Sequence, residues 1–247
     1  MRVCVVLPTY NEAGTIEEVI ERVLAASDQA HILVVDDNSP DGTGALADRI
    51  AATDERVAVL HRPGKGGLGP AYLAGFRHAL AQRFDAMIEM DSDLSHDPAD
   101  VARLIDAAAT ADLVIGSRYV PGGGTRNWSR ARELLSRGGN LYARTLLRFP
   151  LSDATAGFRI YRRAVLEQIP LDEIHSEGYS FQIEMAWRAW TLGFGLAEIP
   201  IVFTERREGT SKMSKSIVFE AVGAVARWAR QRRRPPARPH PRSVVTG

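Results

Sequence analysis

Short apolar runs alternate with amphipathic segments along the first half of this chain. The runs resemble strands buried on both faces of a parallel sheet, which are almost continuous in Val, Ile and Leu. The intervening segments carry apolar residues at the i, i+3, i+4 spacing of a helix. The strands are expected at residues 3–7, 32–35, 57–60, 86–90 and 113–115, and the helices at 16–24, 44–51, 70–80 and 101–108. The pattern predicts an α/β fold with a doubly wound, mostly parallel sheet flanked by helices.

Composition limits the class of protein. The 247 residues are 45% hydrophobic and 25% charged, which excludes wholesale disorder and allows a substantial core. Cys4 is the only cysteine, so an intrachain disulfide or a cysteine zinc cluster is impossible, and we expect it in the core. The chain starts directly in a strand, and its apolar runs are shorter than a membrane span. We therefore expect a cytoplasmic protein.

The segment Asp91-Ser92-Asp93 follows the strand at 86–90. In extended chain, residues i and i+2 point to the same side about 7 Å apart, so a bend there converges both carboxylates on one divalent cation. Such a cation suits a bound diphosphate. The alternative is ordinary turn and capping chemistry, which also favours Asp and Ser at these positions.

Two other strand ends are polar. Tyr10 and Glu12, after the first strand, are suited to stacking on a base and to accepting its hydrogen bonds. Asp36 and Asp37, after the second, suit base or ribose recognition, although the following Asn-Ser-Pro-Asp-Gly is also a plain turn sequence. Because ligands of doubly wound sheets bind beyond the carboxyl ends of the strands, these residues are candidates for one site.

A glycine-rich loop at 62–71 enters the third helix and carries Lys65. Such a loop brings backbone N–H groups, a lysine and a helix N-terminus towards phosphate. It lacks the spacing of a P-loop, and Gly-x-Gly-x-x-Gly does not follow the first strand. The second absence weighs against a nicotinamide-cofactor domain.

In this order, and with Gly116-Ser117-Arg118-Tyr119, the motifs resemble those of the family 2 inverting glycosyltransferases. Among them the chain is most similar to the dolichyl- or polyprenyl-phosphate mannosyltransferases, which have the GT-A nucleotide-diphospho-sugar transferase fold. The resemblance covers about residues 3–215 and continues through segments 132–140, 153–159, 177–181 and 206–213.

The resemblance implies a role for each matching residue. The donor nucleotide-sugar would be bound by Pro8, Tyr10, Glu12, Val35, Asp37, Asp91, Ser92, Asp93, Arg118, Arg206 and Lys212. The metal, Mg²⁺ or Mn²⁺, would be held by Asp91, Asp93 and Ser95, where well-known members carry glutamine in place of Ser95. The acceptor phosphate would be bound by Arg118, Arg132, Ser136 and Arg206. Asp91, Asp93 and Arg118 would form the catalytic set.

The implied reaction is metal-dependent transfer of mannose from GDP-mannose to a polyprenyl (dolichyl-type) phosphate, with inversion, at the cytosolic membrane face. A phosphate acceptor has a second pKa near 6, so it is already anionic and needs no strong general base. The site therefore has to position two anions and neutralise charge, which predicts a single displacement with inversion.

Two other functions compete. The first is transfer of glucose or N-acetylglucosamine from a UDP-sugar to a lipid phosphate or a sugar hydroxyl. A hydroxyl acceptor requires a catalytic carboxylate, for which Glu184 is the candidate, although an exposed or capping position on a helix explains that residue equally. The second is a non-catalytic nucleotide- or RNA-binding module, suggested by seven arginines from Arg227 onward. That tail lacks interleaved aromatics and the acidic strand ends repel a nucleic-acid backbone, so we expect no nucleic-acid partner.

The chain divides into a catalytic domain at 1–213, an amphipathic basic helix at 214–234 and a disordered Pro/Arg-rich tail at 235–247. The helix suits either the interface of an anionic membrane or packing on the core. We expect peripheral contact with the inner face of the membrane, directly or through a membrane-anchoring partner. The glycine-rich segment at 120–127 is predicted to be an active-site lid.

Overall fold

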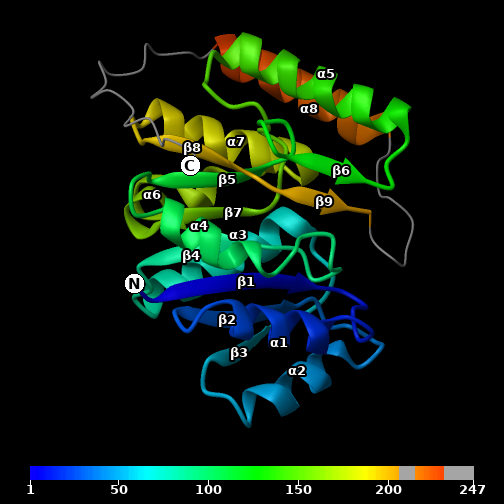
Figure 1. Ribbon diagram of the computed structural model, residues 1–247, viewed down its shortest axis with the longest axis vertical. Coiled ribbons are helices and arrows are strands. Elements are labelled where there is room, and N and C mark those ends of the chain that lie inside the picture. Colours follow the sequence, from blue (N-terminus) through cyan, green and yellow to red (C-terminus); the bar gives the residue numbers. More distant parts are fainter. Residues whose placement is uncertain (206–214, 231–247) are drawn as a thin grey trace.

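The computed structural model describes residues 1–205 and 215–230, with side chains from 220 onward in the second range. A sheet of order β3-β2-β1-β4-β7-β5-β8 forms its centre (Figure 1). Its strands are β1 Val3–Thr9, β2 Ala30–Asp36, β3 Val57–His61, β4 Ala86–Glu89, β5 Leu113–Ser117, β7 Arg159–Arg162 and β8 Leu196–Pro200. Only β7, among these strands, runs antiparallel to its neighbours β4 and β5. The predicted mostly parallel, doubly wound sheet is confirmed.

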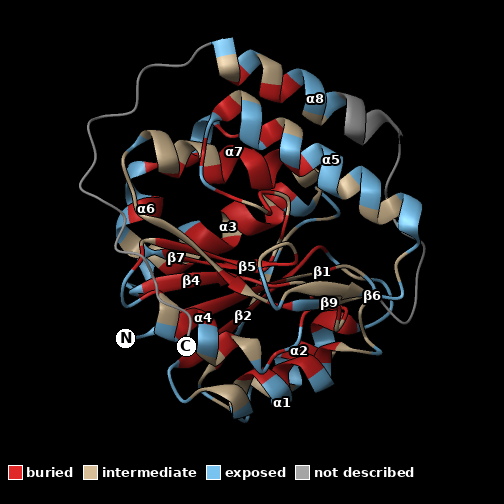
Figure 2. Ribbon diagram, turned by 45° about the horizontal axis from the view of Figure 1, so that its top comes forward, coloured by how far each residue is buried: buried red, intermediate tan, exposed pale blue. Residues whose placement is uncertain are grey.

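Helices cover both faces of the sheet (Figure 2). One layer contains α1 Ile16–Ala26, α2 Thr43–Ala51 and α4 Asp100–Ala107, and the other α3 Leu68–Ala81, α6 Arg163–Gln168 and α7 Gly178–Thr191, with a short 3₁₀ turn η1 at Leu171–Glu173. Side chains of β1 alternate between these layers, because successive residues of a strand face opposite sides. Val3 and Val5 belong to the core under α1 and α4, and Cys4 and Val6 to the core under α3 and α7. Burial raises the pKa of Cys4 to about 12, as befits the predicted core residue.

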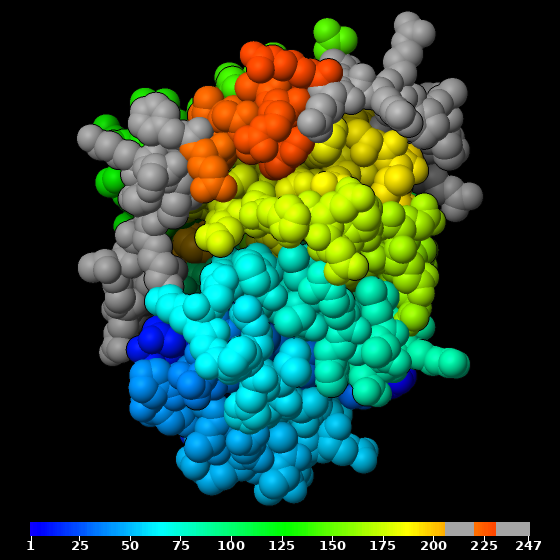
Figure 3. Space-filling model, turned by 180° about the vertical axis from the view of Figure 1, so that it is seen from behind, coloured from blue at the N-terminus to red at the C-terminus, as the bar shows by residue number. Residues whose placement is uncertain are grey.

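Two further helices, α5 Arg130–Leu147 and α8 Lys215–Arg230, lie side by side at the end of the molecule farthest from α2 (Figure 1). α8, orange to red in Figure 3, also covers α7, and the rings of Trp187 and Trp228 stack at 5.7 Å between these two helices. Val225 and Trp228 are buried. The described part of the amphipathic segment therefore packs on the core, whereas residues 231–247 lie outside the described residues.

Some predicted helix starts were wrong by a few residues. α3 starts at Leu68, so Pro70 lies inside its first turn, where a missing N–H costs nothing. The sequence predicts Asp97 as the N-cap of the helix at 101–108, but α4 starts at Asp100, and the Asp97 carboxylate instead accepts a hydrogen bond from Ala99 N–H at 3.1 Å in the preceding turn. The apolar spacing also predicts a helix from Leu134 to Arg148. The corresponding α5 starts four residues earlier, at Arg130, because Ser129 caps it by accepting from Arg132 N–H at 3.3 Å.

The glycine-rich segment at 120–127 is paired rather than open. Its strand β6, Gly124–Arg126, pairs in parallel with β9, Val202–Thr204. Gly123 allows this path, since a Cβ at that position would lie 2.5 Å from the carbonyl oxygen of Ser117. Part of the segment predicted to be an active-site lid is thus a short strand, and the residue just before it lies close to the end of β5.

Crossing a bilayer takes a long, strongly apolar helix. None of the helices in residues 1–205 and 215–230 meets both conditions.

Candidate active site

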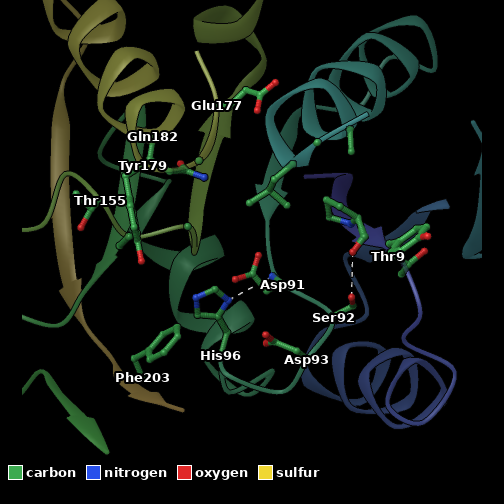
Figure 4. Close-up of a pocket in the computed structure, with 18 of the residues that line it drawn as sticks. Thr9, Asp91, Ser92, Asp93, His96, Thr155, Glu177, Tyr179, Gln182 and Phe203 are labelled. Carbon is green, nitrogen blue, oxygen red and sulfur yellow. Dashed lines mark hydrogen bonds between the residues drawn. The ribbon is translucent and has the colours of Figure 1, made fainter. Parts of the chain in front are cut away.

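A cavity of about 400 Å³ lies at the carboxyl ends of β1, β2 and β4 (Figure 4). Most of the site residues predicted from the sequence line this cavity, although they are spread along the chain from the first strand to α5. These residues are Pro8, Tyr10, Glu12, Asp37, Asp91, Ser92, Asp93, Arg118 and Arg132. The topology explains the convergence, because parallel strands end at the same edge of a sheet.

Other predicted residues lie elsewhere. Val35 is fully buried in the core on the α3 side and is not part of the cavity wall formed by the described residues. Ser95 is buried behind Asp93, and Ser136 lines a second, neighbouring cavity. Arg206 and Lys212 lie outside the described residues.

The two carboxylates after β4 are held by a tight turn. Tyr72 donates a hydrogen bond from its hydroxyl to Asp91 at 3.2 Å, and Ser95 N–H donates to Asp93 at 3.0 Å. Leu94, between Asp93 and Ser95, has a φ of 60°, a left-handed conformation that is strained for a leucine. Burial, and then the charge of Asp91, raises the pKa of Tyr72 well above its usual value, so its hydroxyl remains a donor.

Ser92 ties this turn to the end of β1. Its hydroxyl donates to the carbonyl oxygen of Pro8 at 2.9 Å, and its own carbonyl accepts from the hydroxyl of Thr15 at 2.8 Å. The acids at 91 and 93 are therefore fixed relative to Tyr10 and Glu12, which follow the same strand end.

The residues present fit a hard divalent cation that also takes ligands from its substrate. No three His, Cys, Asp or Glu side chains among the described residues are arranged as a ready-made metal site. Asp91 and Asp93 nevertheless supply the carboxylate oxygens that Mg²⁺ and Mn²⁺ prefer, and Mg²⁺ usually keeps water and substrate phosphates as its other ligands. Within the described part of the chain, the buried Ser95 hydroxyl has no hydrogen-bond partner, which leaves it available as a weak oxygen ligand.

His96 was missed by the sequence analysis. It is 2% exposed, lines the cavity, and stacks on Phe158 with 5.0 Å between ring centroids. Its Nδ1 accepts a hydrogen bond from Asp91 N–H at 3.3 Å, and burial lowers its pKa, so the neutral ring carries its proton on Nε2. The available signal was the polar pair Ser95-His96, which follows the two acids after Leu94 and which was interpreted as part of the turn before the next helix.

The two acids at the end of β2 have different surroundings. Asp36 is structural: it accepts hydrogen bonds from the hydroxyls of Thr9 at 3.1 Å and Ser39 at 2.5 Å. Asp37 lines the cavity and accepts from Arg62 Nη1 at 2.6 Å and from Gly66 N–H at 2.9 Å. The glycine-rich loop is thereby fastened to Asp37.

Arg118 lines the opposite wall and is bound by a buried carboxylate. Its Nε and Nη2 donate to Asp153 at 2.7 and 2.6 Å, and Nη2 also donates to Thr155 at 2.8 Å. Arg118 is 5% exposed and Asp153 fully buried. Burial alone would raise the pKa of Asp153, but the charge and hydrogen bonds of Arg118 hold that pKa below its usual value. Asp153 belongs to one of the motifs recognised in the sequence, but no role was predicted for it.

Arg132 is the second arginine in the cavity wall. Its guanidinium lies 4.1 Å from the ring centroid of Trp128 and forms an ion pair with Glu205. Both Arg132 Nε and Trp128 Nε1 are buried N–H groups without an acceptor among the described residues. This wall of the cavity therefore offers donors and positive charge to an anion.

A second cavity of about 360 Å³ opens beside the first, between α5, α7 and α8. The two cavities share Trp128, Thr155 and Tyr179. The walls of the second are otherwise almost entirely apolar, with Leu134, Leu135, Ile183, Val222 and Val225 among them. A polar, charged cavity thus adjoins an apolar one, and the two have three wall residues in common.

Glu184 is neither exposed nor a cap, contrary to that expectation. It is 4% exposed, accepts from Arg188 Nε at 2.8 Å and pairs with the hydroxyl of Ser176. It is not part of the walls of either cavity as the described residues form them.

A sequence model described as Glycosyl transferase family 2 matches residues 4–170, which include β1 to β7 and most of the cavity wall. The chain belongs to glycosyl transferase family 2. The resemblance seen in the sequence is confirmed, and this protein is a glycosyltransferase with a GT-A-like fold.

Curated relatives of this family 2 chain are similar over most of their length. It is 54% identical over 229 residues to polyprenol monophosphomannose synthase of Mycolicibacterium smegmatis, covering 92% of this chain and 86% of that protein. It is 51% identical over 228 residues to undecaprenyl-phosphate mannosyltransferase of Micrococcus luteus, covering 92% and 94%.

Solved structures share the fold at lower identity. Glucosyl-3-phosphoglycerate synthase of Mycobacterium tuberculosis, in complex with Mn²⁺, UDP-glucose and phosphoglyceric acid, gives a TM-score of 0.68 at 21% identity, covering 92% of this chain and 79% of that one. A mannosyltransferase of Pyrobaculum calidifontis, in complex with GDP-mannose and Mn²⁺, gives 0.58 at 18% identity, covering 92% and 71%. Both of those structures contain a nucleotide-sugar together with Mn²⁺.

Proposed function

We propose that this family 2 glycosyltransferase transfers mannose from GDP-mannose to a polyprenyl phosphate, with inversion and with a divalent metal, at the cytoplasmic face of a membrane. The observation that carries the proposal is that the charged cavity and the apolar cavity adjoin, with three wall residues in common. A lipid phosphate likewise consists of a charged phosphate and an apolar chain. The names of the two curated relatives support mannose as the sugar and a polyprenyl phosphate as the acceptor class. GDP-mannose in the Pyrobaculum structure supports the nucleotide.

The donor is assigned to the edge of the sheet formed by β1, β2 and β4. Tyr10, Glu12 and Asp37 are the residues proposed for the base and ribose, and Asp91 and Asp93 for the metal, with Ser95 as a further oxygen. A bound Mg²⁺ or Mn²⁺ supplies charge neutralisation to the departing nucleoside diphosphate. Asp36 is assigned to the scaffold, since its carboxylate is used within the protein.

The acceptor phosphate is assigned to the junction of the two cavities. Arg118 and Arg132 line the charged side of the junction, and Ser136 lines the apolar cavity. The unsatisfied N–H groups of Arg132 and Trp128, within the described residues, are donors that a phosphate would satisfy. Arg206 and Lys212 remain predicted contributors from outside the described residues.

The chemistry then needs positioning rather than proton abstraction. One phosphate oxygen of the acceptor, already anionic at neutral pH, attacks the anomeric carbon while the bond from that carbon to the donor diphosphate breaks on the opposite side. The arginines offset the repulsion between the two anions. Glu184, the base that a hydroxyl acceptor would have required, is occupied by Arg188 and Ser176, which favours the phosphate acceptor.

The isoprenoid chain is assigned to the apolar cavity. Beside it, α5 exposes Leu134 at 74% and Leu141 at 64%, and α8 exposes Val222 at 43%. Exposed large apolar side chains next to a lipid-sized cavity favour peripheral contact of this end of the molecule with a bilayer. A membrane-anchoring partner stays a separate prediction.

The deciding experiment is a transfer assay that pairs GDP-mannose, UDP-glucose and UDP-N-acetylglucosamine with a short polyprenyl phosphate and Mg²⁺ or Mn²⁺. We expect lipid-linked product from GDP-mannose alone, and none when the acceptor is the corresponding polyprenol or when EDTA is added. Efficient use of a UDP-sugar or of the alcohol would contradict the proposal.

Replacing Gly139 by leucine should block the acceptor selectively. Gly139 lines the apolar cavity, and a Cβ there would meet nothing within 4 Å, so a leucine fits the helix and points into open space. Displacing even two methylenes of lipid costs about tenfold in binding, at ~0.8 kcal/mol for each buried CH₂. We expect KM for the polyprenyl phosphate to rise about tenfold or more with KM for GDP-mannose unchanged.

Gly223→Leu is the matched control. Gly223 is an exposed glycine of α8 that also has open space around its Cβ position, and it is not among the residues lining the cavity in the described chain. Both substitutions should raise thermal stability slightly, because leucine is a better helix former than glycine by about 0.8 kcal/mol. If steady-state kinetics gave an unchanged KM for the acceptor in Gly139→Leu, the assignment of the isoprenoid chain to this cavity would be wrong.

A further inference from the structure

Gln182 is a buried amide with unused hydrogen-bonding capacity at the wall of the charged cavity. It lies in α7, is 3% exposed, and lines the cavity together with Tyr179 and Thr155 (Figure 4). Within residues 1–205 and 215–230, neither Oε1 nor Nε2 makes a hydrogen bond of good geometry, although the amide lies close enough to the buried Glu89 carboxylate to lower the pKa of that group. A buried amide without well-formed hydrogen bonds destabilises a folded protein and is uncommon, which indicates that Gln182 has a role other than stabilising the fold.

The backbone that carries Gln182 is firmly held. Its carbonyl oxygen accepts from Arg159 Nη1 at 2.9 Å, and Arg159 is itself fully buried and bound to the carbonyl of Ala154 at 3.2 Å. The amide therefore projects from a rigid segment of helix. Side chains placed in this way are suited to precise recognition, because little ordering is left to occur when a ligand binds.

The amide lies beside two other residues of the cavity wall. A Cβ at Gly157 would lie 3.6 Å from Gln182 Nε2 and 3.9 Å from His96 Cε1, so Gly157, Gln182 and His96 border one corner of the cavity. His96 in turn contacts Asp91 through its Nδ1. The corner thus adjoins Asp91 and Asp93, the carboxylates assigned to the metal (Figure 4).

We propose that Gln182 recognises a hydroxyl group of the sugar that is transferred. The inference rests on the proposed function, in which a hexose is joined to the diphosphate beside Asp91. A sugar hydroxyl is both donor and acceptor, and it therefore satisfies the amide oxygen of Gln182 as well as an amide N–H that otherwise has only the Glu89 carboxylate nearby. A site built to bind a hydroxyl rejects the analogue that lacks it, because the buried polar group is then left unpaired.

A purely structural role is the competing explanation. Glu89 is fully buried, and its carboxylate oxygens make no hydrogen bond of good geometry within the described residues, although the side chains of Gln182 and Tyr161 lie close to it. Burial raises the pKa of Glu89 to about 7, and neighbouring Arg159 and the Gln182 amide oppose that rise. If Gln182 served only this carboxylate, its replacement would change stability and leave the choice of sugar untouched.

The test uses Gln182→Met, which keeps the length and volume of the side chain and removes its donor and acceptor. Wild type and variant are compared with GDP-mannose and with its 2-, 3-, 4- and 6-deoxy analogues, using kcat/KM for transfer, calorimetric binding of each donor and of GDP alone, and urea unfolding.

We expect wild type to reject one deoxy donor by roughly 10- to 100-fold relative to GDP-mannose. In Gln182→Met, kcat/KM for GDP-mannose should fall by the same factor, so that GDP-mannose and that deoxy donor are transferred equally well. The affinity for GDP should be unchanged, and the stability to urea should be equal or higher. Retained discrimination against every deoxy donor overturns the proposal, and retained discrimination with lowered stability assigns Gln182 to Glu89 instead.

The two proposals fail in different ways. If wild type transfers no mannose, the proposed function fails, and the calorimetric comparison is made with whichever nucleotide-sugar the protein binds and the deoxy forms of its sugar. The role of Gln182 is then supported if Gln182→Met abolishes discrimination among those donors and binds the nucleoside diphosphate as tightly as wild type. It is overturned if discrimination among the donors is retained.

Discussion

Replacing Asp93 by alanine should reduce mannosyl transfer by about 10³-fold or more and abolish metal-dependent binding of GDP-mannose. The substitution removes one of the two cavity carboxylates proposed to hold the divalent cation. Loss of a single group that stabilises developing charge already costs about 10²–10³ in kcat, and loss of the metal weakens charge stabilisation further. Turnover measures the first effect, and calorimetry with and without Mg²⁺ measures the second.

Asp97→Ala is the matched control for this substitution. Asp97 lies four residues further along the same segment, but it is exposed and pairs at the surface with Arg22 at 2.9 Å. Surface pairs of this kind are worth about 0–1 kcal/mol, so activity should be close to that of wild type. An Asp93→Ala protein that still bound GDP-mannose more tightly with Mg²⁺ than without it would show that the metal is held elsewhere.

The sequence was sufficient for those features that depend on local pattern. The strand runs are short and continuous in apolar residues, and the parallel arrangement brings their carboxyl ends to one edge. Tyr10, Asp37 and Asp91 were therefore predicted correctly to meet, although they lie far apart in the chain. No contact between distant residues had to be known for that prediction.

Features that depend on packing were not predictable in the same way. Strand β7 enters the sheet antiparallel between β4 and β5, and its first residue, Arg159, is fully buried against backbone carbonyl groups. Arginines are rarely buried, so a strand that begins and ends with arginine gives no sign of a central position. His96 and Gln182 were missed for the same reason: their place in the cavity wall depends on elements that meet only in the folded chain.

Arg118 shows how a correct residue was assigned an incomplete role. The resemblance predicted it as a phosphate-binding cation, and it does line the cavity. What the sequence did not reveal is that Asp153 binds it through two parallel hydrogen bonds of 2.7 and 2.6 Å. Its positive charge is therefore partly compensated before any anion arrives, and its guanidinium is held in one orientation. A fixed orientation favours positioning of the acceptor phosphate over simple attraction.

Replacing Asp153 by alanine should consequently impair both folding and activity. It leaves the Arg118 guanidinium buried without its counter-ion and removes the acceptor for Arg118 N–H at 3.0 Å. Breaking a buried pair in this way costs about 3–5 kcal/mol, which urea unfolding would measure as a lower midpoint. Transfer should fall at least about 10²-fold even at temperatures where the variant is folded, because the arginine is no longer oriented. Asp172→Ala, at an exposed acid paired with Arg77, should change neither quantity.

The pH dependence separates the ion pair from mere loss of packing. The folded pKa of Asp153 is held below its usual value, so the pair contributes stability that is fully present above the unfolded pKa of about 3.9 and is lost as the pH falls through the folded pKa. The stability difference between wild type and Asp153→Ala should therefore be constant from pH 7 to about pH 5 and shrink below about pH 4. If the stability difference persisted undiminished at pH 3, the cost of Asp153→Ala would come from the cavity left by the side chain. The conclusion that the charge of Asp153 orients Arg118 would then be wrong.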